Sequence, residues 1–249
     1  MQREISFDLL RELDPQALRP IAEGRTIYYF SKRVLDLILA VPALLCLSPL
    51  LAVIAILIKL KSPGPVLFVQ ERVGVKRKTR HHITYWQQVI FRVYKFRTMV
   101  SNADPSLHQA YVKALIDNDG KGMAQLQGKD TQIRKLVHDP RITRLGRILR
   151  KTSLDELPQL WNVIKGEMSL VGPRPAIPYE VEMYKPWHRR RLEAKPGMTG
   201  LWQVTARSSA DFEEIIRLDI QYVEQQSFWL DLKILFKTPL VVISCKGAV

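Results

Sequence analysis

Two adjacent carboxylates, Asp155 and Glu156, occur in the run RKTSLDELPQLWNVIKGEMSLVGPRP, residues 150–175. Pro158 follows them, and proline is best tolerated in the first turn of a helix, so this run predicts a helix that begins near Asp155. The free N–H groups and the dipole at such a helix start stabilise a carboxylate or a phosphate. From these residues alone, Asp155 is equally consistent with a reactive carboxylate and with a plain N-cap.

Cationic residues occur close to this acidic pair and in a predicted strand. In the run VYKFRTM, Lys95 and Arg97 are two positions apart, which predicts that both project from the same face of the strand. Two cations on a half-buried strand need an anion to offset the cost of desolvation, and a phosphate would supply it. Arg150 lies just before the acidic pair, at the end of a predicted helix.

Hydrophobic patterning predicts the elements that position these residues. Two runs rich in β-branched and aromatic residues, 66–74 and 89–99, predict strands with a basic loop between them. Apolar residues at helical spacing predict a helix that begins near Pro140 and another over 228–243. Residues 101–133 are polar and predict short helices. We therefore expect a single α/β domain, mostly helical, attached to a membrane segment.

A long apolar segment precedes this domain. Between Val34 and Ile58 the chain has one charged residue, Asp36, and the segment is long enough to enter or cross a bilayer. Basic residues flank both ends: Lys32, Arg33, Lys59 and Lys61. Because basic flanks mark the cytoplasmic side of a membrane, equal flanks indicate that both ends lie on that side.

A break inside the segment would allow it to turn back. Pro49 removes a helical hydrogen bond, and the hydroxyl of Ser48 can satisfy the freed carbonyl. We expect a helix that bends at this pair and enters and leaves by the cytoplasmic face. A kinked helix that crosses the bilayer is the alternative, since prolines are common in transmembrane helices.

The composition narrows the possible functions. The chain has 249 residues, a formal net charge of +14 and 47% hydrophobic residues, which excludes an intrinsically disordered protein. The charge predicts an anionic partner: nucleic acid, an acidic membrane surface or a phosphorylated substrate. Two cysteines are too few for a disulfide framework or a Cys-rich zinc site. No helix-turn-helix or ribonucleoprotein-type motif indicates a nucleic-acid partner.

Several motifs together resemble the bacterial sugar transferase family, in particular the monotopic polyprenyl-phosphate phosphoglycosyl transferases that begin exopolysaccharide and O-antigen assembly. In chain order they are KRVLDLILA…SPL, SPGPVLFVQERVG, YKFRTM, DPRITRLGRILRKTSLDELPQLWNVIKGEMSLVGPRP and PGMTGLWQV. The resemblance runs from about Lys32 to the C-terminus, and residues 1–31 and 101–133 lie outside its strongest motifs. It implies a lead-in (1–31), a re-entrant membrane helix broken at Ser48-Pro49 (32–61) and a cytoplasmic catalytic domain with interfacial helices (62–249).

The resemblance also implies an enzyme and its site. Asp155 and Glu156 would form the catalytic dyad and bind Mg²⁺. The phosphate-binding candidates are Lys95, Arg97, Arg150 and Arg174, and Pro173 and Pro175 complete a Pro-Arg-Pro motif. The enzyme would pass a sugar-1-phosphate from a UDP-sugar, expected to be a hexose, to undecaprenyl phosphate, and it would release UMP through a covalent aspartyl intermediate.

The expected location is the cytoplasmic face of the bacterial inner membrane, with membrane lipid as a partner, no nucleic acid, and a homo-oligomer left open. A non-catalytic scaffold of a polysaccharide assembly complex is the alternative function. Three tryptophans, Trp187, Trp202 and Trp229, are equally consistent with interfacial anchors and with core residues. His188 and the arginines at 189–191 are expected to face anionic headgroups.

Overall fold

The computed structural model describes residues 17–21, 25–80, 82–101, 104, 106–117, 119–127, 139, 141–206 and 210–243. Most of the predicted lead-in and the end of the 101–133 region lie outside these residues. Within that region, the predicted short helices are confirmed as α3 (Ser106–Ile116) and α4 (Gly120–Gln127).

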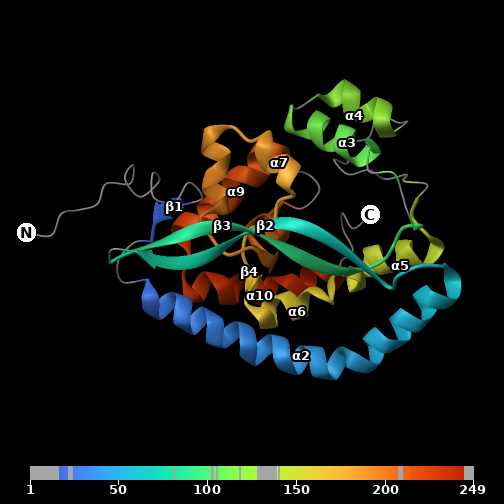
Figure 1. The fold of residues 1–249 in the computed structure, drawn as a ribbon, viewed down its shortest axis with the longest axis horizontal. Helices are drawn as coiled ribbons and strands as arrows, with labels where there is room; N and C mark the ends of the chain where they lie inside the picture. Colours follow the sequence, from blue (N-terminus) through green and yellow to red (C-terminus); the bar gives the residue numbers. More distant parts are fainter. Residues whose placement is uncertain are drawn as a thin grey trace, which may run out of the picture.

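A long β-hairpin runs along the length of the domain (Figure 1). Strands β2 (Leu67–Arg80) and β3 (Ile83–Phe96) pair antiparallel, and both are longer than the predicted strands, because the basic residues assigned to a loop continue the ladder. A short strand, β1 (Ala17–Pro20), pairs with the outer edge of β3, so the order is β1-β3-β2. Part of the predicted lead-in therefore belongs to the sheet of the domain.

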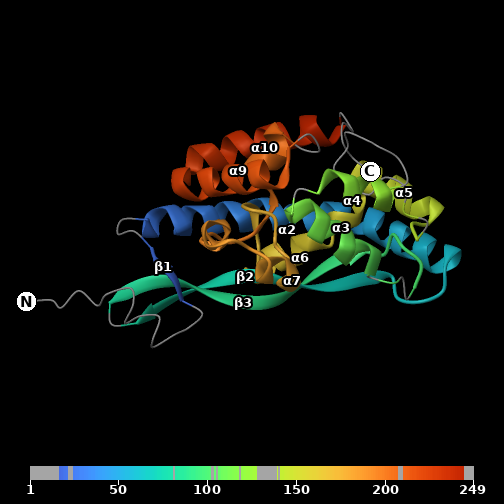
Figure 2. The ribbon, with the colours of Figure 1, turned by 90° about the horizontal axis from the view of Figure 1, so that it is seen from above.

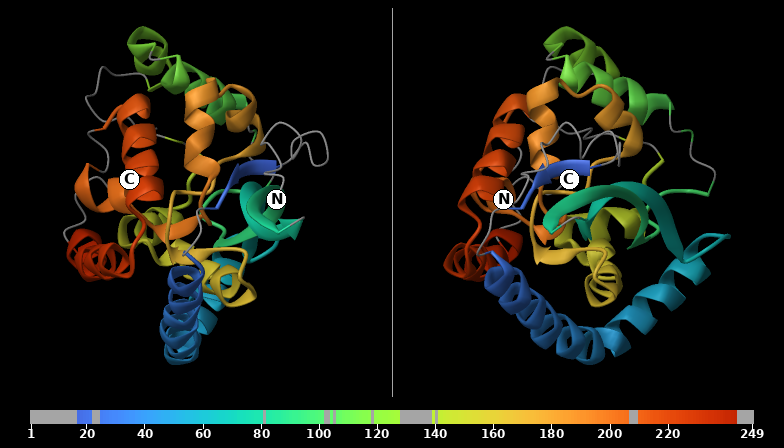
Figure 3. Two further views of the ribbon diagram at one scale, coloured as in Figure 1. Left: turned by 90° about the vertical axis from the view of Figure 1, so that its left-hand side faces the viewer. Right: turned by 60° about the vertical axis from the view of Figure 1, so that its left-hand side comes forward.

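Helices and a second small sheet complete the domain. Strand β4 (Ser169–Val171) pairs in parallel with β5 (Gly197–Thr199). The remaining elements are α5 (Arg144–Thr152), η1 (Leu154–Glu156), α6 (Gln159–Lys165), α7 (Pro178–Glu182), η2 (Pro186–Leu192), α8 (Leu201–Thr205), α9 (Phe212–Gln225) and α10 (Phe228–Ile243). The hairpin lies on one side of the molecule and α9 with α10 on the other (Figures 2 and 3). The predicted helix over 228–243 is confirmed.

The apolar segment forms one bent helix, α2 (Thr26–Lys61), with Pro42 and Pro49 inside it. The Ser48 hydroxyl donates to the Leu45 carbonyl at 2.7 Å, which confirms its predicted role, because proline at position 49 has no N–H for that carbonyl. Both arms of the helix rise from the bend toward the rest of the domain (Figures 1 and 3). Only 11% of its most apolar window is buried, and α2 is the one described helix long and apolar enough to cross a membrane.

Each arm of α2 packs against the same domain through a narrow buried stripe. Ala40, in the first arm, contacts the cluster around Val163 and Met168. Ile54 and Ile58, in the second arm, belong to a cluster with residues of β3 and α5. The remaining apolar side chains of both arms are largely exposed, as on a lipid-facing helix.

The charged residues at the beginning of α2 point inward, whereas the sequence predicts that they flank a bilayer. Lys32 Nζ lies 2.8 Å from Asp231 Oδ2 in α10, and both side chains are buried. Asp36 accepts hydrogen bonds from the Ser169 hydroxyl and the next backbone amide in β4. Arg33 donates to two carbonyls in the last turn of α6. These residues therefore fasten α2 to the domain, because their partners come from elements far along the chain.

A second exposed apolar surface lies on α10, where Trp229 is 78% exposed and Phe236 is also exposed. Trp202 is buried and Trp187 packs against a core cluster, so Trp229 alone among the three candidates has the exposure of an interfacial anchor. His188 is fully buried as well. The expectation that His188 and its following arginines together face headgroups is therefore wrong for His188.

Candidate active site

The two carboxylates lie on the 3-10 turn η1, between α5 and α6. Ser153 ends α5 in a left-handed conformation, with φ 58°, and this reverses the chain direction. Pro158 is the N-cap of α6, so α6 begins at Gln159. Asp155 and Glu156 therefore precede the helix by about one turn, whereas the sequence predicts that the helix begins at or near Asp155.

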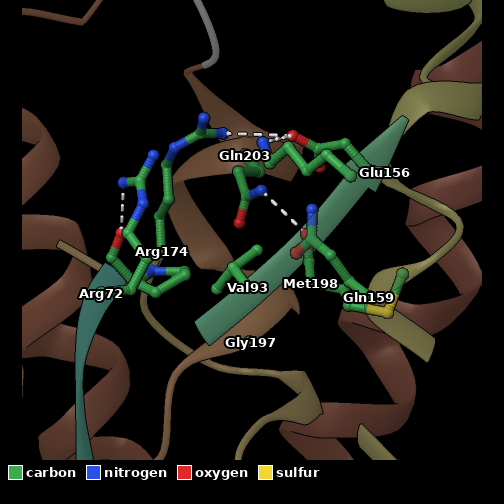
Figure 4. A pocket seen from close by; sticks show the side chains of 10 residues that line it. Arg72, Val93, Glu156, Gln159, Arg174, Gly197, Met198 and Gln203 are labelled. Carbon is green, nitrogen blue, oxygen red and sulfur yellow. Dashed lines mark hydrogen bonds and ion pairs between the residues drawn. The ribbon is translucent and has the colours of Figure 1, made fainter. Parts of the chain in front are cut away.

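Glu156 is held by two cations from different elements. Lys95 Nζ, on β3, lies 2.6 Å from Glu156 Oε1, and Arg174 Nη1 lies 3.8 Å from the same oxygen (Figure 4). Burial opposes the ionisation of Glu156, but Lys95 and Arg174 outweigh it and lower the pKa of this carboxyl to about 2. Glu156 is therefore a permanent negative charge that fixes the cations around it.

Asp155 has a different environment although it is the adjacent residue. Within the part of the chain that the structure describes, its carboxylate accepts no hydrogen bond and forms no ion pair closer than 4 Å. Burial and the charge of Glu156 raise the pKa of Asp155 to about 6, against the opposing effect of Lys95, Arg150 and Arg174. At neutral pH Asp155 is therefore ionised, yet it is more basic than an ordinary aspartate and free to react.

Arg150 and Arg174 lie near the dyad, as the sequence predicts. Arg150 is oriented by its Nε, which donates to the Thr98 hydroxyl at 2.9 Å. Burial lowers the pKa of Arg150, and the nearby charge of Asp155 opposes that shift. Arg174 belongs to the Pro-Arg-Pro segment, which follows β4, and its side chain is 42% exposed.

Arg97 does not join this group. Strand β3 ends at Phe96, so the alternation that would place Lys95 and Arg97 on one face stops one residue too early. The Arg97 guanidinium donates to the carbonyls of Ser62 and Pro63 and to the Ser62 hydroxyl. Arg97 thus fixes the turn that follows α2. The sequence places it among the phosphate-binding candidates, and the structure corrects this by directing its side chain away from the dyad.

Arg72, on β2, is a cation of the site that sequence reasoning missed. It is 8% exposed and lines one pocket together with Lys95, Glu156 and Arg174 (Figure 4). Burial and the charge of Arg174 lower the pKa of Arg72 to about 10. A lone arginine in a strand-like run has no spacing signal, and only the approach of the Pro-Arg-Pro segment to β2 places Arg72 here.

Two uncharged polar side chains, Gln159 and Gln203, also line the pocket. Gln203 Nε2 donates to the Met198 carbonyl at 3.1 Å, and Gln203 Oε1 is buried with no hydrogen-bond partner in the described chain (Figure 4). Gln159, the first residue of α6, is 3% exposed and lines the same pocket. Amide groups in this position suit the hydroxyl or imide groups of a ligand whose phosphates contact the cations.

The carboxylates of the site meet the requirements of Mg²⁺ only with the help of a substrate. This ion is usually bound by one or two carboxylates together with waters and substrate phosphates. Among the described residues, no group of three or more His, Cys, Asp or Glu side chains gathers around one point. Glu156 is occupied by Lys95, whereas Asp155 has free carboxylate oxygens. The residues therefore fit an ion shared between Asp155 and a bound phosphate, with Glu156 less suited as a ligand.

Several known proteins are similar in sequence to this chain over most of its length. The "Undecaprenyl-phosphate galactose phosphotransferase" of Salmonella typhimurium is 42% identical over 219 residues, which are 88% of this chain and 42% of that protein. The "Exopolysaccharide production protein ExoY" of Sinorhizobium fredii is 38% identical over 232 residues, or 93% and 91% of the two chains. The Aeromonas hydrophila "UDP-N-acetylgalactosamine-undecaprenyl-phosphate N-acetylgalactosaminephosphotransferase" is 37% identical over 98% of this chain and 50% of its own length.

The chain thus spans less than half of the Salmonella protein but nearly all of ExoY. The model of one family, described as bacterial sugar transferase, matches residues 27–245, which include α2, the hairpin, the dyad and α10. That match covers well over half of the chain. The protein belongs to the bacterial sugar transferase family.

Proposed function

We propose that the protein is a phosphoglycosyl transferase that passes a hexose-1-phosphate from a UDP-sugar to undecaprenyl phosphate, releases UMP and so initiates exopolysaccharide or other surface glycan synthesis. The observation that carries the proposal is Asp155, a half-buried carboxylate with no ion-pair partner among the described residues, next to a pocket in which cations outnumber acids. The names of the relatives, which specify undecaprenyl phosphate with galactose or N-acetylgalactosamine, support this substrate class.

In the first half-reaction, a carboxylate oxygen of Asp155 attacks the sugar-bearing phosphorus of the UDP-sugar. A bond forms between that oxygen and phosphorus while the bond from phosphorus to the bridging oxygen breaks, and UMP leaves with the electron pair. Arg72 and Arg174 can offset the charge of the diphosphate, for which a guanidinium offers paired donors. The pKa of about 6 supports this role, since Asp155 is ionised at neutral pH but not strongly stabilised.

In the second half-reaction, an oxygen of undecaprenyl phosphate attacks the same phosphorus. The bond to Asp155 breaks, the carboxylate is restored, and the product is an undecaprenyl diphosphate that carries the sugar. Because donor and acceptor react in turn at one carboxylate, the kinetics should be ping-pong. Glu156 does not react in this scheme, and its part is to hold Lys95 and Arg174 beside the phosphates.

We propose that Mg²⁺ is held by Asp155 and the diphosphate of the substrate. When bound, the ion supplies positive charge that offsets the repulsion between the carboxylate and the phosphates. The cations that line the pocket act in the same direction.

We further propose that α2 enters and leaves the membrane by the cytoplasmic face of the inner membrane. The first arm packs against α6 and β4, and Ile58, at the end of the second arm, packs against Phe96 and Leu149 of the same domain. A helix that crossed the bilayer would separate these contacts by the thickness of the membrane. The re-entrant arrangement places η1 near the lipid surface, where the phosphate of a polyprenyl acceptor is presented.

The experiment that tests the function is a release assay. The purified chain is incubated in nanodiscs with Mg²⁺, undecaprenyl phosphate and, in turn, UDP-galactose, UDP-glucose and UDP-N-acetylgalactosamine. We expect UMP and lipid-linked sugar phosphate in equal amounts with at least one donor. Release of UDP would contradict phosphosugar transfer. Absence of any product, together with normal polysaccharide synthesis by an Asp155→Ala strain, would favour the scaffold alternative.

A further inference from the structure

The Pro-Arg-Pro segment is held from outside by a set of backbone and side-chain donors. Its two prolines have no N–H, so the segment has few donors for bonds within itself. Each of four successive carbonyls accepts from another element: Pro173 from the Gly197 amide (2.9 Å), Arg174 from Arg191 Nη2 (3.2 Å), Pro175 from Arg72 Nη1 (2.7 Å) and Ala176 from the Val73 amide (2.8 Å). The path of the segment is therefore set by its neighbours.

Among these donors, Arg191 is the one whose side chain bonds the backbone of Arg174, and it does not line the pocket of the candidate site. It lies on η2 and is 5% exposed, which differs from the expectation that the arginines at 189–191 face headgroups. Its Nη1 donates to the Tyr184 hydroxyl at 2.8 Å, and its Nη2 lies 2.6 Å from Asp219 Oδ2 in α9. Burial opposes its charge, but Tyr184 and Asp219 outweigh it and raise the pKa of Arg191, which therefore stays a cation.

Stability alone does not explain this buried pair. An ion pair of this kind is often no more stabilising than apolar residues of the same volume, because both charges lose water. Asp219 Oδ1 has no hydrogen-bond partner in the described chain, so the pair does not satisfy every polar atom of Asp219. The contact that links Arg191 to the candidate site is the one with the carbonyl of Arg174.

The side chain of Arg174 needs such support from its backbone. Its Nη1 lies 3.8 Å from Glu156, beyond hydrogen-bond distance, and the side chain is 42% exposed. The direction of its guanidinium is consequently set mainly by the backbone position of Arg174. A shift of about 1 Å in a group that positions a substrate can reduce the rate by about 10²-fold.

We propose that Arg191, backed by Asp219 and Tyr184, is a positioning residue that fixes the backbone of Arg174 and thereby aims the Arg174 guanidinium at the donor diphosphate. The inference rests on the proposed function and deepens it, because it adds a residue that does not touch substrate. It predicts that Arg191 acts on the reaction only through Arg174.

A double-mutant cycle tests this dependence. We expect Arg191→Lys to keep the charge but lose the fork of donors, and to lower kcat/KM for the UDP-sugar by about 10-fold or more, mainly through KM. Arg174→Gln should cause a larger loss, and the double variant should be no worse than Arg174→Gln alone. If the two losses multiply, Arg191 does not act through Arg174 and the proposal is wrong.

Control variants separate positioning from folding. Arg190→Gln removes the neighbouring, partly exposed arginine, which pairs with Glu224, and we expect the kcat/KM of this variant to be unchanged. If Arg191→Lys does not fold, Tyr184→Phe removes only one acceptor of Arg191 and should raise KM a few-fold in the wild-type background. That increase should be absent in the Arg174→Gln background, and its persistence would overturn the proposal.

The same cycle is also measured as the dissociation constant for UDP, by calorimetry. This readout needs no turnover, so it distinguishes the two possible failures. If the effects of the two substitutions on the dissociation constant for UDP simply multiply, while the wild type releases UMP normally, only the positioning role is contradicted. If the double variant binds UDP no more weakly than Arg174→Gln, but the wild type releases no UMP, the proposed reaction is contradicted and the positioning of Arg174 is still supported.

Discussion

Among the described residues, two lysine–carboxylate pairs lie in sheltered positions, and their surroundings differ. Lys32 and Asp231 are 2.8 Å apart where α2 meets α10, and the hydroxyls of Tyr28 and Tyr222 also donate to Asp231. Lys95 and Glu156 are 2.6 Å apart in the candidate site, where further cations surround them.

The first cluster is balanced, with one positive and one negative charge and hydroxyl donors around the carboxylate. In the second cluster, the described residues that line the pocket include three cations, Lys95, Arg72 and Arg174, and one carboxylate, Glu156. Asp155 lies beside them with no ion-pair partner in the described chain. Buried charges are usually paired, so an excess of cations indicates that a ligand supplies the missing anion. The contrast separates a structural ion pair from one that belongs to a binding site.

The largest effect is expected for Asp155→Asn, which removes the nucleophile but preserves the shape of the side chain. UMP release should fall by at least about 10³-fold, while the melting temperature and the association with nanodiscs stay unchanged. Asp117→Asn, at the exposed end of the 106–117 segment, is the matched control and should retain full activity. Turnover near the wild-type rate in Asp155→Asn would remove Asp155 from the chemistry.

Lys32→Met should mainly affect stability, because it leaves Asp231 as an uncompensated buried charge. We expect the free energy of unfolding in detergent to fall by about 3–5 kcal/mol, with little change in kcat for the folded fraction. The double variant Lys32→Met with Asp231→Asn should recover much of the loss. An unchanged unfolding curve for Lys32→Met would show that the Lys32–Asp231 pair does not stabilise the fold.

Lys95→Met should show the opposite pattern. Glu156 keeps Arg174 as a partner, so the loss of stability should be smaller than for Lys32→Met, whereas kcat/KM should fall by about 10- to 10²-fold. Steady-state kinetics and thermal unfolding of the two variants side by side measure the contrast. If Lys32→Met and Lys95→Met reduced kcat/KM equally, the two clusters would not differ in function.

The smallest effect is expected in the pH profile. Because kcat/KM reports ionisations of the free enzyme, it should decrease as the pH falls through about 6, where Asp155 becomes protonated. Glu156→Gln removes a charge that raises the pKa of Asp155, so the acid limb should move to lower pH even though the maximal rate declines. Glu182→Gln, an exposed change on α7, should leave the midpoint in place. A midpoint that does not move in Glu156→Gln would contradict the coupling of the two carboxylates.

Much of the secondary structure could be predicted from the sequence, but the partners of the charged residues could not. The two long strands, the broken apolar helix and the C-terminal helix follow from local patterns, since proline and β-branched residues act over a few positions. A catalytic role for the adjacent acids comes from the resemblance, because their local pattern fits a plain N-cap equally well. The inward direction of Lys32 and Asp36 could not be predicted, because their partners Asp231 and Ser169 lie far along the chain. A flank of a membrane helix and a buried ion pair use the same residue types.

Only part of the candidate site could be predicted, because some of its residues depend on contacts between distant segments. Lys95, Arg150 and Arg174 lie near the dyad, as the motifs indicate, but Arg97 lies one residue beyond the end of β3 and turns to the segment after α2. Arg72 was missed because its place in the pocket depends on how β2 meets the Pro-Arg-Pro segment. Strand alternation predicts which face a residue occupies, but not where the strand ends or what packs against it.

The most direct test of the central claim is to incubate the protein with the UDP-sugar in the absence of undecaprenyl phosphate and to measure its intact mass. The account predicts an increase equal to one sugar phosphate, located by peptide mapping on Asp155, absent from Asp155→Asn and lost when the lipid acceptor is added. An adduct on any other side chain, or UMP release that requires both substrates together and leaves no adduct, would contradict it.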